Sequence, residues 1–171
     1  MFRLYPERPA DTAEVELLFD LAFAPGRTAL SSYRLRDGVP MLGALSLVAR
    51  DDYDVVAGAI RYWPVVVGQA AAAPALLLGP IAVHPTRQGE GLGALLMSES
   101  LSRARALGWR RVLLVGDRPY YARFGFDHVP VEFPAPTNQD RVLGLALTEG
   151  ALDGFGGAVA PWPAARAAMP G

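Results

Sequence analysis

Residues 75–129 read ALLLGPIAVHPTRQGEGLGALLMSESLSRARALGWRRVLLVGDRPYYARFGFDHV, and this stretch decides the fold class. The apolar run over 75–83 predicts a strand buried on both faces, and a glycine-rich turn over 88–93 leads from it into a helix. A second apolar run predicts a strand over 111–115, before a short helix over 119–124. Because the first N–H groups of a helix have no intrahelical partner, the turn predicts a site for a phosphate or pyrophosphate group.

The strand predicted over 75–83 is interrupted by Gly79 and Pro80. Proline has no backbone N–H to donate to a neighbouring strand, so it is uncommon inside a central strand without a local irregularity. We therefore expect a β-bulge at this pair, or the point at which pairing to one neighbouring strand ends.

The rest of the chain predicts a mixed α/β domain over residues 1–160, followed by a Pro- and Ala-rich tail over 161–171. Asp11 is predicted to be the N-cap of a helix, and Glu14 three residues later completes the pattern of a capping box. The turn over 50–54 joins two apolar runs and indicates an antiparallel hairpin. The further predicted elements are strands over 2–6, 42–49, 55–67, 129–133 and 142–147, and a short helix over 31–36.

Composition excludes several classes of function. The formal net charge is −1 and the isoelectric point about 6.1, so the chain lacks the basic surface with which nucleic-acid-binding proteins hold phosphates. It has no cysteine, and its two histidines, His84 and His128, are not spaced as metal ligands, so no metal site is expected. The N-terminal residues lack an apolar signal segment, and no apolar stretch approaches the ~20 residues of a membrane span. We expect a cytoplasmic protein with no nucleic-acid partner and no membrane partner.

The glycine turn also fits the G-x-G-x-x-G/A pattern of dinucleotide-binding folds, through Gly89, Gly91 and Ala94. Three features count against a nicotinamide cofactor. Five residues separate the strand from Gly89, whereas that motif turns directly off its strand. The acidic candidate Asp117 lies 28 residues past Gly89, against about 20 in the motif. Only 54 residues follow Asp117, which is too few for the remaining strand–helix units of such a fold.

Two motifs in this stretch resemble those of one superfamily. The spacing Val83-x-x-x-x-Gln88-x-x-Gly91-x-Gly93 resembles the acyl-CoA signature Q/R-x-x-G-x-G/A of the GCN5-related N-acetyltransferases (GNAT). The segment YARFGF over 121–126 resembles the Y-x-x-x-G-F segment of the same superfamily. The stretches LLLGPIAVHP, LLVGDRPYYARFGF and GALDGFGGAV look most similar to the YhbS-like branch of bacterial acetyltransferases. The resemblance covers the chain from its first strand to about residue 159.

This resemblance implies a mixed, mostly antiparallel sheet of about six to seven strands with a splayed parallel pair, flanked by about four helices. It also implies acetyl-CoA as cosubstrate, with no metal. In such a fold the splayed strand leaves backbone groups of Ile81, Ala82 and Val83 for the amides of the pantetheine arm. The pyrophosphate is expected on the turn and helix start, formed by Gln88, Gly89, Glu90, Gly91, Leu92, Gly93 and Ala94.

The resemblance makes Tyr121 the catalytic candidate. A thiol with a pKa of roughly 8.5 leaves as a thiolate, and a tyrosine with a pKa of about 10 stays protonated at neutral pH, so its hydroxyl can hydrogen-bond to or protonate the departing sulfur. The neighbouring Tyr120 is the alternative, but Tyr121 keeps the four-residue spacing to Gly125. A purely structural role under the sheet is the other interpretation of Tyr121.

The chain departs from the superfamily pattern at two places. Many members carry a glutamate as general base on the splayed strand, whereas residues 75–83 contain no acid. The amine must therefore lose its proton to another group, for which His84 is a secondary candidate, or to a water chain, or arrive neutral. Many members place an asparagine after the next strand, where this chain has Gly116 and Asp117. Asp117 either caps the short helix or contacts the ligand, and Arg123 is either solvated or contacts the CoA 3′-phosphate.

We therefore expect an acetyl-CoA-dependent N-acetyltransferase that transfers the acetyl group to a primary amine by direct attack in a ternary complex. The alternative is a non-catalytic acyl-CoA-binding or regulatory domain of the same fold. The absence of a glutamate from residues 75–83 favours this alternative, and the presence of Tyr121 argues against it. The acceptor is expected to be a small-molecule or peptide amine, and the chain is expected to be a monomer or a homodimer.

Overall fold

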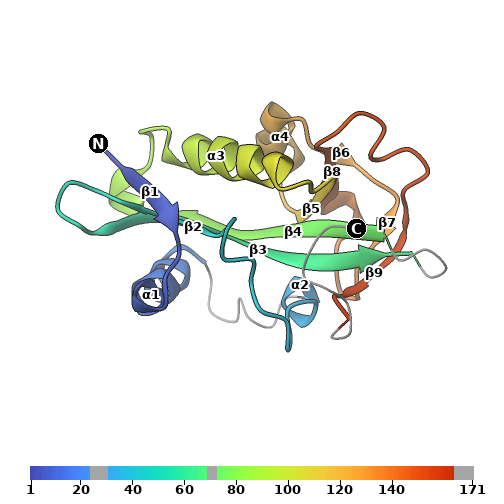
Figure 1. Ribbon diagram of the computed structural model, residues 1–171, viewed down its shortest axis with the longest axis horizontal. Helices are drawn as coiled ribbons and strands as arrows, with labels where there is room; N and C mark the ends of the chain where they lie inside the picture. Colours follow the sequence, from blue (N-terminus) through green and yellow to red (C-terminus); the bar gives the residue numbers. More distant parts are fainter. Residues whose placement is uncertain (24–30, 69–72, 164–171) are drawn as a thin grey trace.

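The computed structural model describes residues 1–23, 31–68 and 73–163, and it contains one sheet with helices packed against both faces (Figure 1). The helices α3 (Leu92–Ala106) and α4 (Arg118–Tyr121) lie over one face, and α1 (Thr12–Ala22) and α2 (Ser31–Arg34) lie over the other. The strands are β1 (Arg3–Pro6), β2 (Leu47–Arg50), β3 (Val56–Val67), β4 (Ala73–Val83), β5 (Arg111–Val115), β6 (Asp127–His128), β7 (Val131–Glu132), β8 (Val142–Ala146) and β9 (Gly157–Pro161).

The strands pair in the order β1-β2-β3-β4-β5-β8-β6, and β9 pairs with both β3 and β7. Neighbouring strands are antiparallel except for β4 with β5 and β7 with β9. The helix α3 connects the parallel strands β4 and β5. The mixed, mostly antiparallel sheet with a parallel pair is therefore confirmed. Nine strands are present where about six to seven were expected, because the short strands β6 and β7 take the place of the single strand predicted over 129–133 and because β9 was not predicted.

The bulge predicted at Gly79 and Pro80 is present where β4 pairs with β3. Leu78 lies opposite Tyr62 and Ile81 lies opposite Ile60, so two residues of β4 face a single residue of β3. Gly79 has a φ of +123°, which a residue with a Cβ rarely adopts. The glycine is therefore required by the backbone conformation of the bulge itself.

Pairing between β4 and β5 is short. It extends only over Leu76 with Val112 and Leu77 with Leu113, and it ends before the bulge. Beyond Leu77 the strand β4 continues to Val83 and stays paired with β3 alone. The expected splay of the parallel pair is confirmed, and it leaves one edge of the last part of β4 open.

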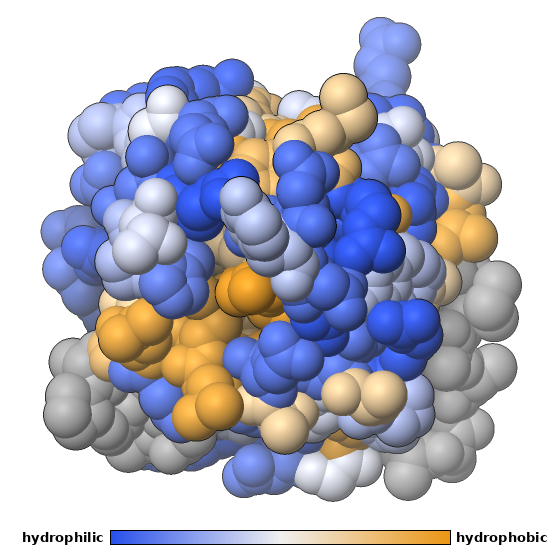
Figure 2. All heavy atoms as spheres, turned by 90° about the vertical axis from the view of Figure 1, so that its left-hand side faces the viewer, coloured by the Kyte–Doolittle hydropathy of each residue, from blue (hydrophilic) through white to orange (hydrophobic). Residues whose placement is uncertain are grey.

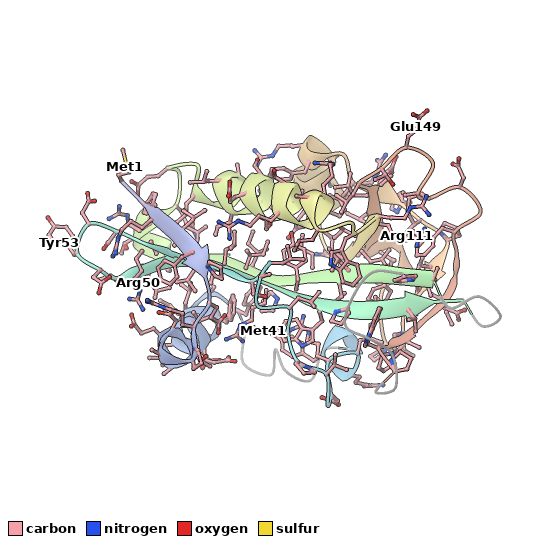
Figure 3. All side chains as sticks on the ribbon, in the orientation of Figure 1. Met1, Met41, Arg50, Tyr53, Arg111 and Glu149 are labelled. Carbon is pink, nitrogen blue, oxygen red and sulfur yellow. The ribbon has the colours of Figure 1, made fainter. Side chains whose placement is uncertain are left out.

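The capping box predicted at Asp11 is wrong. The helix α1 begins at Thr12, so Asp11 occupies the predicted N-cap position, but its side chain makes no capping hydrogen bond to that helix. Its carboxylate instead accepts hydrogen bonds from the Arg8 backbone N–H at 2.9 Å and from the Arg50 guanidinium at 2.8 Å. Burial alone raises the pKa of Asp11, but these bonds outweigh it and hold the pKa well below its usual range. Arg50 extends from the sheet toward α1, where it also binds Glu14 (Figure 3).

The chain after residue 156 contributes to the sheet and to the core. The strand β9 pairs with β3 from Val65 opposite Pro161 to Val67 opposite Val159. The indole of Trp162 is 7% exposed and packs against Trp109, with ring centroids 6.0 Å apart. Residues 164–171 of the expected tail lie outside the described residues.

Among the described residues, no helix is long and apolar enough to cross a membrane. Figure 2 shows the end of the molecule at the left of Figure 1, where hydrophilic side chains cover most of the surface and apolar ones form separate patches.

Candidate functional site

The helix α3 begins with backbone N–H groups that point out of its first turn. Gly91 precedes the helix with a φ of +78°, and the first helical bond runs from the Leu95 N–H to the Gly91 carbonyl at 3.1 Å. The N–H groups of Leu92, Gly93 and Ala94 come before this bond, and Gly91 has no side chain with which to cap them. This end of the helix also carries the positive pole of the helix dipole, so it suits an anion.

A cavity of about 460 Å³, here called the turn cavity, lies at this helix start. It is lined by Val83, Arg87, Gln88, Gly89, Gly91, Leu92, Gly93, Ala94, Tyr120 and Arg123. Seven of the ten predicted cofactor-binding residues are in this lining. Arg123 lies over the Tyr120 ring, with its guanidinium carbon 4.5 Å from the ring centroid. Arg87 also lines the cavity, with its guanidinium carbon 4.9 Å from the Phe2 ring centroid. The cavity therefore combines free helix N–H groups with two stacked cations, which is the chemistry that phosphate oxygens require.

Of the other three predicted residues, Ile81 lines a second cavity described below, whereas Glu90 and Ala82 line neither cavity. The Glu90 carboxylate forms an ion pair with Arg87 at 3.0 Å, which partly neutralises that arginine. Ala82 is buried and packs in a cluster with the α1 residues Val15, Leu18 and Phe19.

A second cavity, here called the splay cavity, has a volume of about 140 Å³ and lies where β4 and β5 separate. It is lined by Phe23, Tyr33, Arg36, Leu77, Leu78, Gly79, Pro80, Ile81, Leu114, Val115 and Tyr121. Ile81 lines this cavity and Val83, two residues along the same strand, lines the turn cavity. Because residues two apart face the same side of a strand, the two cavities follow one surface of β4.

Tyr121 is held in the splay cavity by aromatic neighbours. Its ring meets Tyr120 nearly edge-on at 4.9 Å and Phe126 at 6.0 Å. None of the hydrogen bonds found among the described residues involves its hydroxyl. Burial, reinforced by the neighbouring Tyr120, raises the pKa of Tyr121 to about 12. A thiol is then a stronger acid than this phenol by about three pKa units, which favours a hydrogen bond to a thiolate over transfer of the proton to it.

Gly116, whose contact with Tyr121 the sequence did not predict, sets the position of that ring. A Cβ built on Gly116 lies 2.5 Å from Cε2 of Tyr121 and 3.1 Å from Cδ1 of Leu114. The aromatic ring occupies the space that any other side chain at 116 needs, so the glycine lets the ring lie against the backbone that follows β5.

We expect Gly116→Ala to displace the Tyr121 ring and to lower kcat by roughly 10²-fold, because a misplacement of about 1 Å costs that much at a reacting group. Overpacking adds a loss of about 1–3 kcal/mol in unfolding free energy. Steady-state kinetics and thermal unfolding measure both effects. Gly43→Ala is the control, because a Cβ there meets nothing within 4 Å. Wild-type kcat in Gly116→Ala is the contradicting result.

Arg36 and Tyr33 also line the splay cavity. The family resemblance implies that residues 27–38 lie over the acceptor site, but neither of these two side chains was singled out from the sequence. Both lie on or next to α2, whose four residues carry no motif. Their approach to β4 depends on contacts between distant parts of the chain. No motif in the sequence around Tyr33 and Arg36 predicts this approach.

The remaining candidates lie at the edges of the two cavities or away from them. Asp117 occupies the N-cap position of α4, but its side chain makes no capping hydrogen bond and is exposed. His84 caps the turn at residues 85–87, where its Nδ1 accepts from the Thr86 N–H at 3.2 Å, and it is absent from the described lining of both cavities. His128 is exposed, as expected. Among the described residues, no group of three or more His, Asp or Glu side chains is arranged to hold a metal ion.

Comparison with known families identifies an acetyltransferase domain. The family model described as "Acetyltransferase (GNAT) domain" matches residues 43–128, which include both the glycine turn and Tyr121. The uncharacterised N-acetyltransferase YhbS of Escherichia coli K12 is 31% identical over 157 residues, which cover 90% of this chain and 92% of that protein.

Solved structures show the same relationship. The crystal structure of YhbS from Escherichia coli in complex with CoA has a TM-score of 0.79 and 28% identity, with 94% of this chain and 89% of that chain covered. A GNAT family acetyltransferase from Brucella melitensis, solved with acetyl-CoA, has a TM-score of 0.72 and 32% identity, with 96% and 97% covered. The splayed strands and the open helix start agree with the match to the GNAT domain and with the 31% identity to YhbS over 90% of this chain. The chain therefore belongs to the GNAT acetyltransferase family and to its YhbS-like branch.

Proposed function

We propose that this protein is an acetyl-CoA-dependent N-acetyltransferase that acts on a primary amine by direct transfer in a ternary complex. The observation that carries the proposal is the open edge of β4 after Leu77, which runs between the turn cavity and the splay cavity. A ligand with a phosphate group at one end and a reactive group at the other fits this arrangement. The related structures from Escherichia coli and Brucella melitensis contain CoA and acetyl-CoA, respectively.

The residues present fit CoA along its length. The pyrophosphate would meet the N–H groups of Leu92, Gly93 and Ala94, and Arg123 would add a cation beside them. The pantetheine amides would pair with the open backbone edge of β4 as a substitute strand, as strand addition to a sheet edge does elsewhere. The thioester would then reach the splay cavity beside Tyr121.

Acetyl-CoA supplies the acetyl thioester, and the amine nitrogen forms a C–N bond to the acetyl carbon while the C–S bond breaks. The sulfur takes the electron pair of the broken bond, and the nitrogen loses a proton. Tyr121 would donate a hydrogen bond to the sulfur as its negative charge develops. Because the pKa of Tyr121 is about 12, its phenol keeps its own proton, and the thiolate receives the proton that the amine releases, through water.

The splay cavity offers no carboxylate to accept the amine proton. None of its described lining residues is acidic, and the segments that the structure leaves undescribed, 24–30, 69–72 and 164–171, contain no Asp or Glu in their sequences. The amine would therefore arrive as the free base or lose its proton to water. The same feature favours the second candidate function, a non-catalytic acyl-CoA-binding or regulatory domain.

We propose further that the acceptor is a small-molecule or peptide amine. The chain would act as a monomer or a homodimer in the cytoplasm, without a nucleic-acid or membrane partner. The formal charge of −1 supports the absence of a polyanionic partner.

Calorimetry with CoA and with NAD tests the cofactor. We expect CoA and acetyl-CoA to bind with micromolar dissociation constants and NAD to give no heat of binding at the same concentrations. Thiol release from acetyl-CoA with a panel of amines then separates the enzyme from the non-catalytic domain. Tight binding of NAD without a CoA signal contradicts the proposal. Binding of acetyl-CoA without turnover on any amine supports the non-catalytic alternative.

A further inference from the structure

Arg36 is the charged residue among the described residues that line the splay cavity. Its guanidinium carbon lies 3.8 Å from the Tyr33 ring centroid and 4.5 Å from the Trp63 ring centroid. Trp63 is itself fixed by a hydrogen bond of 3.0 Å from its indole N–H to the Val39 carbonyl. The two rings hold the guanidinium in place, so the cation is a built part of the cavity wall.

The guanidinium also approaches the bulge of β4. A Cβ built on Gly79 lies 4.0 Å from Nη2 of Arg36, and Gly79 and Tyr121 line the same cavity. The cation therefore lies beside the point where an acetyl group at Tyr121 would meet its acceptor. None of the described residues that line the splay cavity has a side-chain carboxylate, and the sequences of the undescribed segments contain no Asp or Glu. The side-chain charge in the wall of the splay cavity is therefore positive.

We propose that the acceptor is a small amine that carries a carboxylate close to its amino group, as an amino acid does, and that Arg36 binds this carboxylate. The inference rests on the proposed acetyltransferase function and names its substrate class. A guanidinium presents two parallel N–H donors that match the two oxygens of a carboxylate, and the low dielectric of an apolar cavity strengthens the pair. The aromatic and aliphatic lining, including Phe23 and Tyr33, suits an apolar side chain on the same molecule.

This role differs from a direct role in the chemistry. A cation that stabilised the reacting thioester would help every acceptor equally, because the thioester is the same in each reaction. A cation that binds the acceptor carboxylate helps only acceptors that have one. Arg36 is therefore a specificity-determining residue in this proposal, and matched acceptors distinguish the two roles.

The test compares L-phenylalanine, L-leucine and L-methionine with their carboxamides, each with saturating acetyl-CoA and thiol release as the readout. We expect kcat/KM for each amino acid to exceed that for its amide by about 10- to 100-fold, as for one charged hydrogen-bonded pair. The amide has the less basic amine and so more free base at a given pH. A preference for the carboxylate therefore cannot come from amine protonation.

Arg36→Gln is expected to lower kcat/KM for the amino acids by about 10- to 100-fold more than for their amides, which removes the preference, and Arg36→Lys is expected to restore part of it. Arg34→Gln, which removes an exposed charge at the end of the adjacent helix α2, is the control and should keep the preference. Thermal unfolding and the CoA dissociation constant verify that each variant is folded and binds its cosubstrate. Equal or faster reaction of the amides, or an equal loss on both series in Arg36→Gln, overturns the inference and leaves the acetyltransferase function standing. Absence of transfer to either series and to the amine panel, with acetyl-CoA bound, overturns the function and the inference together.

Discussion

Replacing Gly93 with valine should raise the dissociation constant of CoA by at least about 100-fold. Gly93 is in the first turn of α3, and a Cβ built on it lies 3.1 Å from the Tyr120 hydroxyl and 3.8 Å from a methyl group of Val83. A valine side chain there enters the turn cavity and holds the phosphates away from the helix N–H groups. Loss of two charge-assisted hydrogen bonds, at about 1.5–3 kcal/mol each, accounts for an effect of this size.

Gly93 is a cleaner position for this experiment than Gly91. Gly91 has a φ of +78°, so any side chain there strains the backbone as well as blocking the cavity. Gly93 has an ordinary helical conformation, in which valine is more favourable than glycine, and the added Cβ requires only a small shift of the Tyr120 hydroxyl. Ser98→Val is the matched control, because residue 98 is exposed on the same helix and is absent from the described lining of the cavity. Calorimetry on both variants, with thermal unfolding, separates binding from folding. If Gly93→Val binds CoA as tightly as Ser98→Val, the phosphates are not at this helix start.

The turn cavity could be predicted from the sequence because its geometry is local. Glycines at fixed spacing, the strand before them and the helix after them lie within one short segment. The bulge was equally local, since it follows from a proline inside an apolar run. In both cases the residues that form the structure are the same residues whose pattern predicts it.

The parts that were missed depend on contacts between distant residues. Asp11 has the sequence pattern of a capping residue, but Arg50, 39 positions away, binds its carboxylate. The Asp11 carboxylate is occupied by Arg50 and by the Arg8 backbone N–H instead of the start of α1, and the contact with Arg50 depends on the fold and not on residues near Asp11 in the sequence. The strand β9 reads GAVAP, with little hydrophobic alternation, and is a strand because β3 and β7 pair with it.

The splay cavity shows the same division. Tyr121 was found through its motif, but the residues that control it and face it were not. Gly116 limits the space around the ring, and Arg36 reaches the cavity from the segment after α2, which lies over the face of the sheet opposite α4 (Figure 1). A motif therefore indicates the reacting group, and only the fold indicates what surrounds it.

Tyr121→Phe should lower kcat by roughly 10²–10³ with little change in the affinity for acetyl-CoA. The hydroxyl would stabilise a thiolate charge that exists only as the C–S bond breaks, so its loss affects the transition state and not the ground state. Removal of one preorganised donor to a developing anion typically costs this much. Because none of the hydrogen bonds among the described residues uses this hydroxyl, the unfolding free energy should change by no more than about 1 kcal/mol.

The adjacent tyrosine supplies a matched control. Tyr120 lines the turn cavity and Tyr121 lines the splay cavity, although their rings are in contact. Tyr120→Phe should therefore weaken CoA binding modestly and leave kcat nearly unchanged, which is the opposite pattern. Single-turnover kinetics with saturating acetyl-CoA, together with calorimetry, separates the two effects.

The pH dependence of the wild-type rate provides an independent measurement. A phenol that must stay protonated to donate loses activity as the pH rises through its pKa. Burial raises the pKa of Tyr121 to about 12, so no alkaline decrease from this group should appear up to about pH 10. With the ordinary tyrosine pKa of about 10, half of the phenol would already be ionised at that pH. A decrease centred near pH 10 that disappears in Tyr121→Phe would show a donor that is solvated rather than buried. A Tyr121→Phe variant with the wild-type rate while chemistry is rate-limiting would leave the tyrosine only its packing against Tyr120 and Phe126.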